Sequence, residues 1–185
     1  MTTPQTRLLV GLAAILAVVA WWFYSHEAVK ERTVDLIAEF PHAQHRSNMQ
    51  PVDVAFEVGS VTIDGQTKRT ILAKPFSRIT YTVIVPPDAW LDVDFAMRPD
   101  SWDLPGDGAA FRIGVSEGRT YDEILNQFVN PKAGARRWFS KHLDLSAYEG
   151  RRVSLIFNTD PGPAGGGDSQ NDLPVWGEPH VYSGR

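Results

Sequence analysis

Residues 78–97, RITYTVIVPPDAWLDVDFAM, carry the clearest strand signals of this 185-residue chain. The first part, 78–85, is rich in β-branched residues and ends at a Pro-Pro pair, which is typical of a strand and its terminus. The second part, 89–97, alternates apolar and polar side chains, so that Asp92 and Asp94 would face solvent. Either Trp90 or its neighbours Leu91, Val93 and Phe95 would face a core. The stretch therefore predicts two strands of an all-β domain.

The same pattern extends to both sides of this stretch. Residues 52–58 alternate in the same way and lead into a predicted hairpin that turns at Asp64 and Gly65. Segment 121–128 predicts either a short helix or an irregular excursion, and 160–172 is too polar and glycine-rich to pack. Further short strands are predicted at 70–73, 109–115, 138–145, 152–158 and 175–182. Because 15 Gly and 13 Pro concentrate between short apolar runs, we expect about eight strands in one domain spanning residues 51–185.

The N-terminal stretch 8–24, LLVGLAAILAVVAWWFY, contains no charged residue. As a helix its 17 residues would reach about 25 Å, near the lower limit for crossing a hydrocarbon core. We therefore predict a transmembrane helix over 8–25 that acts as a signal anchor. The alternative is a cleaved signal peptide, since Val18-Val19-Ala20 offers small residues to a peptidase, but the bulky aromatic residues that follow favour a membrane interface.

The charges on either side of this stretch predict its orientation. Arg7 and the α-amino group precede it without an acid, whereas Glu27 and Glu31 dilute the basic residues after it. The positive-inside rule then places the tail, 1–7, in the cytoplasm and the C-terminal domain on the periplasmic or extracellular side. We expect a single-pass protein of the inner (cytoplasmic) membrane.

Residues 26–50 are predicted to form a juxtamembrane helix and a linker. Helix formers with apolar residues on one face cover 27–40, and Pro41 would end that helix. The polar linker contains His42 and His45, which a helical turn would set on one face. These two histidines could bind a metal, although no third ligand lies near them in the sequence. The alternative is that they are ordinary residues of a polar linker.

The composition excludes several classes of function. The chain has no cysteine, which excludes disulfides, thiolate metal sites and cysteine nucleophiles, and its net charge of −4 argues against a nucleic-acid partner. It contains no G-x-S-x-G, no H-E-x-x-H and no phosphate-binding glycine loop followed by a helix. Asp92 and Asp94 share a strand face, as carboxylates on a solvent face often do. We therefore expect no enzymatic activity.

Four segments of the second half resemble a known family. They read ITYTVIVPPDAWLDVDFAM, GDGAAFRIGV, RRWFSKHLDLSAYEGRRVSLIFNTDPGP and VWGEPHV. Over about residues 73–182 the chain resembles the jelly-roll domains of the galactose-binding-like and carbohydrate-binding-module type. In these a W…DLS.Y.G strand leads into a V.L.F.T strand, and a W..P.I strand closes the sandwich. The resemblance implies a jelly-roll β-sandwich, which serves in different proteins as a glycan binder, an adhesion module or a spacer.

The resemblance also implies a candidate ligand or partner surface. Ligand sites in such domains combine aromatic rings with carboxylates, and Trp102 with Asp107 in a loop, and Trp176 with Glu178 in the closing strand, fit that description. Each tryptophan has a structural alternative, because Trp176 suits a core and Trp102 would cap the sandwich. A structural calcium, common in this family, would draw on Asp103, Asp107 and Glu178. No other cofactor is expected.

Two hypotheses of function follow. The main one is a non-catalytic, membrane-anchored accessory subunit of a larger membrane complex, such as a photosynthetic reaction-centre or light-harvesting assembly. Small residues would let partner helices pack closely on the span. His26 is the histidine placed to ligate a chlorophyll-type magnesium, although an interfacial histidine usually contacts lipid headgroups instead. The predicted bilayer and partner-helix interface consists of Gly11, Ala14, Trp21, Trp22, Phe23 and Tyr24. The alternative is a membrane-anchored carbohydrate-binding module, which predicts exposed aromatic rings on the sandwich.

Overall fold

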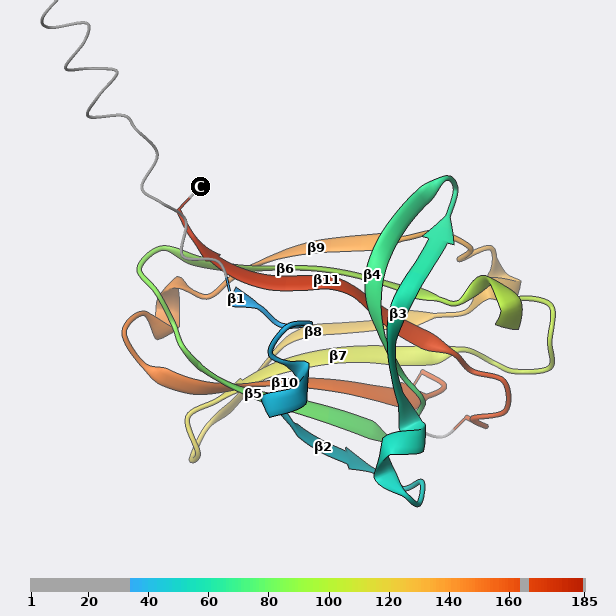
Figure 1. Cartoon of the computed structure of the whole chain (residues 1–185), viewed down its shortest axis with the longest axis horizontal. Coiled ribbons are helices and arrows are strands. Elements are labelled where there is room, and N and C mark those ends of the chain that lie inside the picture. Colours follow the sequence, from blue (N-terminus) through green and yellow to red (C-terminus); the bar gives the residue numbers. More distant parts are fainter. Residues whose placement is uncertain (1–33, 164–166, 185) are drawn as a thin grey trace, which may run out of the picture. The chain divides into compact units, whose positions relative to one another are not determined.

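The computed structural model describes residues 34–163 and 167–184, which form two antiparallel β-sheets packed face to face (Figure 1). The six-stranded sheet has the order β3-β4-β11-β6-β9, and β1 pairs with β11. Its strands are β1 (Val34–Asp35), β3 (Phe56–Ile63), β4 (Gln66–Ala73), β6 (Ala89–Met97), β9 (Phe139–Asp144) and β11 (Pro174–Ser183). The all-β prediction is confirmed, and the two-sheet arrangement is consistent with a jelly roll.

The five-stranded sheet has the order β2-β5-β10-β7-β8. Its strands are β2 (Gln44–Ser47), β5 (Ser77–Ile84), β7 (Ala109–Ser116), β8 (Tyr121–Val129) and β10 (Arg152–Pro161). Single 3₁₀ turns lie between strands: η1 (Phe40–His42), η2 (Val52–Ala55), η3 (Pro99–Ser101), η4 (Pro131–Ala133) and η5 (Ser146–Tyr148). The described part of the chain thus holds eleven strands rather than about eight, and 121–128 belongs to a strand rather than to a short helix or an irregular excursion.

The core lies between the sheets and is centred on four aromatic residues. Phe95 and Trp176 come from the six-stranded sheet, Phe111 and Phe157 come from the five-stranded sheet, and each is at most 1% exposed. The Trp176 ring centroid lies 4.9 Å from that of Phe111 and 5.0 Å from that of Phe157. Burial of this much apolar surface, at about 25 cal/mol per Å², is the main stabilising contribution to the fold.

The N-terminal part of the described chain differs from the predicted helix and linker. Residues 34–40 form β1, a turn and the start of η1, and the predicted linker contains β2, which pairs with β5. The side chain of Asp35 accepts hydrogen bonds from the backbone N–H groups of Ile37 and Ala38, which favours a turn over a helix. Leu36 is fully buried in the core, so its apolar character reflects the sandwich rather than a helical face.

The predicted loop 160–172 also differs from expectation where it is described. Its first two residues belong to β10, and Asp172 is only 4% exposed, so the loop packs against the sandwich at both ends. Within 34–163 and 167–184, no helix has the length and apolar character needed to cross a bilayer. The predicted tail, signal anchor, partner-helix interface and His26 lie outside these ranges.

Candidate functional site

The outer face of the six-stranded sheet carries three rows of polar and aromatic side chains. They arise from β6, whose Leu91, Val93 and Phe95 point into the core, so that Trp90, Asp92 and Asp94 point outward. Residues directly opposite one another in antiparallel strands share a face. The rows across β9, β6 and β11 are therefore Asp144–Trp90–Tyr182, His142–Asp92–His180 and Ser140–Asp94–Gly177.

Rings from neighbouring rows contact one another. The Trp90 indole stacks on the His142 imidazole with ring centroids 4.1 Å apart and an angle of 11° between the planes. The ring centroid of Tyr182 lies 5.9 Å from that of His142 and 5.5 Å from that of His180. The Tyr182 hydroxyl oxygen is 2.9 Å from His142 Nδ1. Three strands thus contribute to one cluster of rings on a partly exposed surface.

Asp92 connects the two histidines of its row. Its Oδ1 lies 2.5 Å from His142 Nδ1, and its Oδ2 lies 3.7 Å from His180 Nε2. Because a carboxylate oxygen accepts hydrogen bonds, the contact assigns the hydrogen to His142 Nδ1. In the neutral imidazole, His142 Nε2 is then the ring nitrogen that can accept a hydrogen bond. The contact with Asp92 also fixes the orientation of the imidazole against Trp90.

Asp94 organises the third row. It forms an ion pair with Lys68 of β4, with Nζ and Oδ2 2.7 Å apart, and it accepts a hydrogen bond from the Ser140 hydroxyl. The Lys68 ammonium lies 5.8 Å from the ring centroid of Trp138. Gly177 makes room for that indole, since a Cβ at this glycine would lie 3.0 Å from the ring.

Two hollows lie along these rows. One has a volume of about 380 Å³ and is lined by Lys68, Asp92, Val93, Asp94, Ser140, Lys141 and His142. The other measures about 300 Å³ and is lined by Asp88, Trp90, Asp144 and Ser146. Rings, carboxylates, an ammonium and hydroxyl groups therefore face solvent together, which is the set of groups that binds sugar rings and their hydroxyls.

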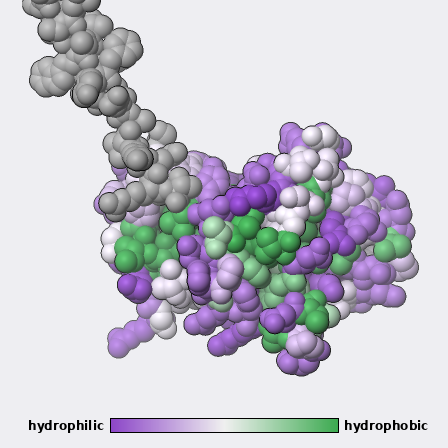
Figure 2. Space-filling model, viewed as in Figure 1, coloured by the Kyte–Doolittle hydropathy of each residue, from purple (hydrophilic) through white to green (hydrophobic). Residues whose placement is uncertain are grey.

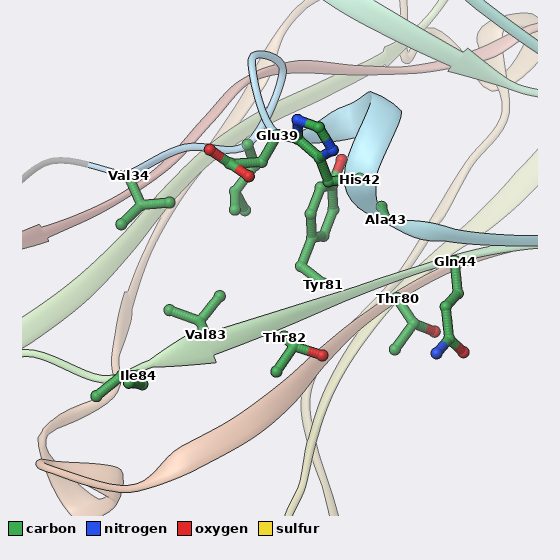
Figure 3. Close-up of a pocket in the computed structure, with 11 residues that line it drawn as sticks. Val34, Glu39, His42, Ala43, Gln44, Thr80, Tyr81, Thr82, Val83 and Ile84 are labelled. Atoms are coloured by element: carbon green, nitrogen blue, oxygen red, sulfur yellow. The ribbon is translucent and has the colours of Figure 1, made fainter.

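A separate cleft of about 340 Å³ lies between the N-terminal segment and the edge of β5 (Figure 3). β2 pairs with Ser77–Thr80 only, and the cleft follows β5 from Thr80 to Ile84. Its buried Tyr81 has a hydroxyl without a hydrogen-bond partner, and burial raises the pKa of this phenol. On the face viewed in Figure 2 the apolar surface is divided into several areas by hydrophilic residues.

The two tryptophans predicted for the ligand surface are placed differently. Trp176 is 1% exposed at the centre of the core, so the structural alternative is correct for it and it does not belong to a surface site. Trp102 is half-buried against the core, and its Nε1–H donates to the Met97 carbonyl at 2.8 Å. The Arg136 guanidinium lies 5.6 Å from the Trp102 ring, which suits a residue that closes one end of the sandwich.

The carboxylates predicted for calcium do not come together as a set. Asp103 forms an ion pair with Arg136 at 2.5 Å, and Glu178 is an exposed residue in the irregular part of β11. Asp107 instead meets Asp168 and Asp172, with carboxylate oxygens of all three within 4.8 Å of one another. The donors present, carboxylates alone, suit a hard cation such as calcium.

The predicted histidine pair forms no metal group with other ligands of the described residues. His45 stacks on Phe40 with ring centroids 4.2 Å apart, and its Nε2 lies 3.0 Å from the Phe40 carbonyl oxygen. His42 lines the cleft beside β5.

The sequence interpretation missed Trp90, His142, His180 and Tyr182 as parts of one surface. The period-two pattern of 89–97 could have indicated that Trp90 shares a face with Asp92, but the opposing residues depend on strand register.

No family model matches the chain. An uncharacterized protein of Archaeoglobus fulgidus is 33% identical over 132 residues, which cover 66% of this chain and 33% of that protein. The chain therefore spans about a third of the length of this relative.

Solved structures that resemble the chain include carbohydrate-binding modules. The CBM51 module of Clostridium perfringens GH95, in complex with methyl-galactose, matches 80% of this chain and 99% of that chain, with a TM-score of 0.54 and 11% identity. TmCBM61, in complex with β-1,4-galactotriose, matches 80% of this chain and 93% of that chain, with a TM-score of 0.52 and 13% identity. At these identities the likeness shows the fold, which is the jelly-roll sandwich of carbohydrate-binding modules.

Proposed function

We propose that this protein is a non-catalytic carbohydrate-binding protein whose ligand lies on the outer face of the six-stranded sheet. The observation that carries the proposal is the stacked pair of Trp90 and His142, with Asp92 joined to the imidazole and Tyr182 beside it. Aromatic rings contact the C–H faces of sugars, and carboxylates and imidazoles bond the hydroxyls. The shared fold with carbohydrate-binding modules supports the proposal.

The alternative function predicted from the sequence is thus the better supported one. The comparisons lend no support to an accessory role in a photosynthetic assembly, and the residues on which that hypothesis rests lie outside the described ranges. Anchorage to a membrane through 8–25 remains part of the proposal, with the sandwich presented on the periplasmic or extracellular side. A membrane-anchored sandwich would hold the glycan close to the cell surface.

A glycan array followed by titration calorimetry tests this function. Methyl-galactose and β-1,4-galactotriose are the first soluble probes, because the modules that share the fold are seen with them. Replacing Trp90→Ala removes the ring on which His142 stacks and should weaken binding by about 30-fold, the effect of losing about 2 kcal/mol at an interface hot spot.

Tyr121→Ala is the matched control, since this ring is 49% exposed on the opposite sheet. It should leave glycan affinity unchanged. Both variants should keep the thermal midpoint of the native protein to within a few degrees. An array without any retained glycan, or equal losses in the two variants, would contradict the proposed site.

A further inference from the structure

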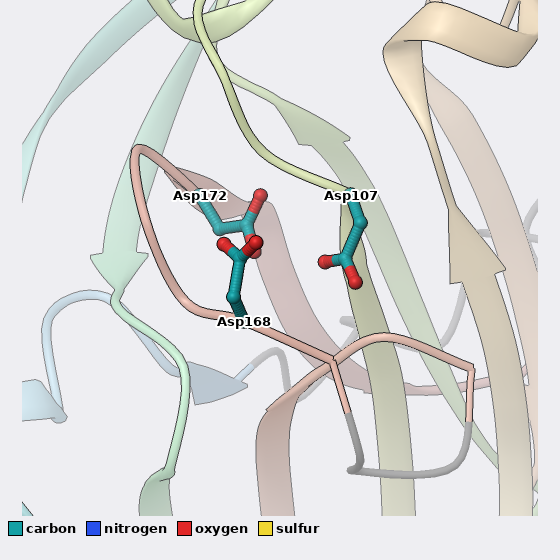
Figure 4. A group of neighbouring side chains, drawn as sticks. All are labelled: Asp107, Asp168 and Asp172. Carbon is teal, nitrogen blue, oxygen red and sulfur yellow. The ribbon is translucent and has the colours of Figure 1, made fainter.

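The loops β6–β7 and β10–β11 bring three aspartates together at one end of the sandwich. Asp107 lies just before β7, and Asp168 and Asp172 lie just before β11. Oxygen atoms of all three carboxylates lie within 4.8 Å of one another, and Figure 4 shows the three side chains directed toward a common space. The cluster is separate from the rows on the six-stranded sheet.

The burial of Asp172 and of one Asp107 oxygen distinguishes the cluster from an ordinary acidic surface. Asp172 is 96% buried, as its exposed fraction is 4%, and its Oδ2 has no hydrogen-bond partner. The buried Oδ1 of Asp107 also has none. A buried carboxylate oxygen without a partner costs free energy, and the cluster contains two such oxygens that a ligand could satisfy.

No ion pair balances the three charges. Among the described residues, none of the ion pairs includes Asp107, Asp168 or Asp172. The Lys132 ammonium acts on Asp172 through its charge, but it donates its hydrogen bond to the Gly106 carbonyl at 2.9 Å. Burial and the neighbouring carboxylates raise the pKa of Asp172 to about 6, although the hydrogen bond from the Gly108 N–H lowers this pKa. Holding the three carboxylates together in their charged form without a bound cation therefore costs free energy.

The backbone around the cluster is shaped to keep the oxygens close. A Cβ at Gly106 would lie 2.7 Å from the Gln170 carbonyl oxygen and 3.0 Å from Asp172 Oδ1, so only glycine lets the two loops approach this closely. A Cβ at Gly167 would collide with Asp107 Oδ2. The Gln170 carbonyl oxygen thus lies beside the carboxylates and can complete an all-oxygen ligand shell.

The geometry points to a calcium ion held by Asp107, Asp168 and Asp172, which ties the β6–β7 loop to the β10–β11 loop. Calcium takes six to eight oxygen ligands from carboxylates and backbone carbonyls in irregular loops, whereas magnesium demands a near-ideal octahedron. Zinc and copper favour nitrogen and sulfur ligands, and no histidine or cysteine belongs to the group. This assignment does not depend on the proposed glycan site.

Calcium titration of the full-length chain tests the assignment, in a mild detergent because of the apolar stretch 8–24. The protein is first stripped with EDTA and is then titrated with calcium chloride and, separately, magnesium chloride by calorimetry, with thermal midpoints recorded alongside. Calcium should bind at one site per chain and raise the midpoint as its concentration rises. Asp168→Asn, an exposed position that the core does not need, should weaken calcium affinity about tenfold or more by removing one ligand charge.

Asp103→Asn is the matched control, because Asp103 lies in the β6–β7 loop but pairs with Arg136 instead. It should bind calcium like the native chain, and Asp172→Asn, which preserves size, should lose binding as Asp168→Asn does. The assignment is overturned if millimolar calcium gives neither heat nor a midpoint shift. It is also overturned if magnesium binds as tightly as calcium, or if Asp168→Asn and Asp103→Asn behave alike.

Discussion

The outer faces of the two sheets are built by the same alternation yet present different chemistry. On the six-stranded sheet, rings from β6, β9 and β11 contact one another around Asp92. On the five-stranded sheet, Arg112 pairs with Asp160 at 2.6 Å, Arg78 donates to Asn158, and Tyr121 is an exposed ring among these charged residues. The difference shows that exposure of an aromatic ring is not by itself a site. A site requires rings and hydrogen-bonding groups arranged in adjacent rows.

The largest expected effect is a difference in the free energy of unfolding between variants of the inner tryptophan, Trp176, and the outer tryptophan, Trp90, of the six-stranded sheet. Trp176→Ala should lower the free energy of unfolding by about 3–5 kcal/mol, because it empties the centre of the core. Trp90→Ala should cost about 1 kcal/mol, since this side chain is partly exposed. Urea unfolding of both variants measures the two costs. If Trp90→Ala were as destabilising as Trp176→Ala, the outer rings would be structural and the contrast between the two faces would fail.

A smaller effect, on glycan affinity, is expected when one carboxylate on each outer face is neutralised. Asp92→Asn removes the charge that holds His142 and should weaken glycan binding by about 1–2 kcal/mol, roughly tenfold. Asp160→Asn changes a carboxylate that is paired with Arg112 on the five-stranded sheet and should leave glycan affinity unchanged. Titration calorimetry with the best glycan from the array measures both. Equal affinity of the two variants would indicate that charge on the six-stranded face plays no part in recognition.

The sequence predicts much of each face but not how the faces are assembled. Period-two alternation in 89–97 predicts that Asp92 and Asp94 face outward, and the structure decides the open choice by burying Leu91, Val93 and Phe95 rather than Trp90. The partner of Asp92, however, is His142, which lies 50 residues later in the chain. That contact depends on the register of β6 with β9, and register follows from turns and core packing across the whole sheet.

Local propensity also misled at two segments. Residues 34–40 have helix-forming composition, but the sandwich buries Leu36, and Asp35 caps a turn through its side chain. Segment 121–128 lacks clear alternation because a bulge shifts the register of β8 between Ile113 and Gly114 of β7. Of the three clustered aspartates only Asp107 was a candidate from the sequence, since Asp168 and Asp172 lie in a polar, glycine-rich loop that gives no sign of packing against Asp107.

The smallest expected effect concerns the glycine beneath one ring on each face. Gly177 underlies Trp138 on the six-stranded sheet, and Gly114 underlies Tyr121 on the five-stranded sheet. Alanine at either site gains about 0.5–1 kcal/mol of backbone entropy over glycine within a strand, which offsets part of the cost of displacing the ring. The net change in stability should therefore be below about 1 kcal/mol for each.

What distinguishes the two glycine variants is the ligand response. Gly114→Ala should push the exposed Tyr121 ring outward without changing glycan affinity. Gly177→Ala should shift the Trp138 indole, which lies beside Lys68 and the Asp94 row, and so change tryptophan fluorescence and the affinity for longer glycans that reach this row. Calorimetry with methyl-galactose and with β-1,4-galactotriose measures the two lengths. If Gly177→Ala left both affinities unchanged while the fluorescence moved, the bound sugar would be confined to the Trp90 and Asp92 rows.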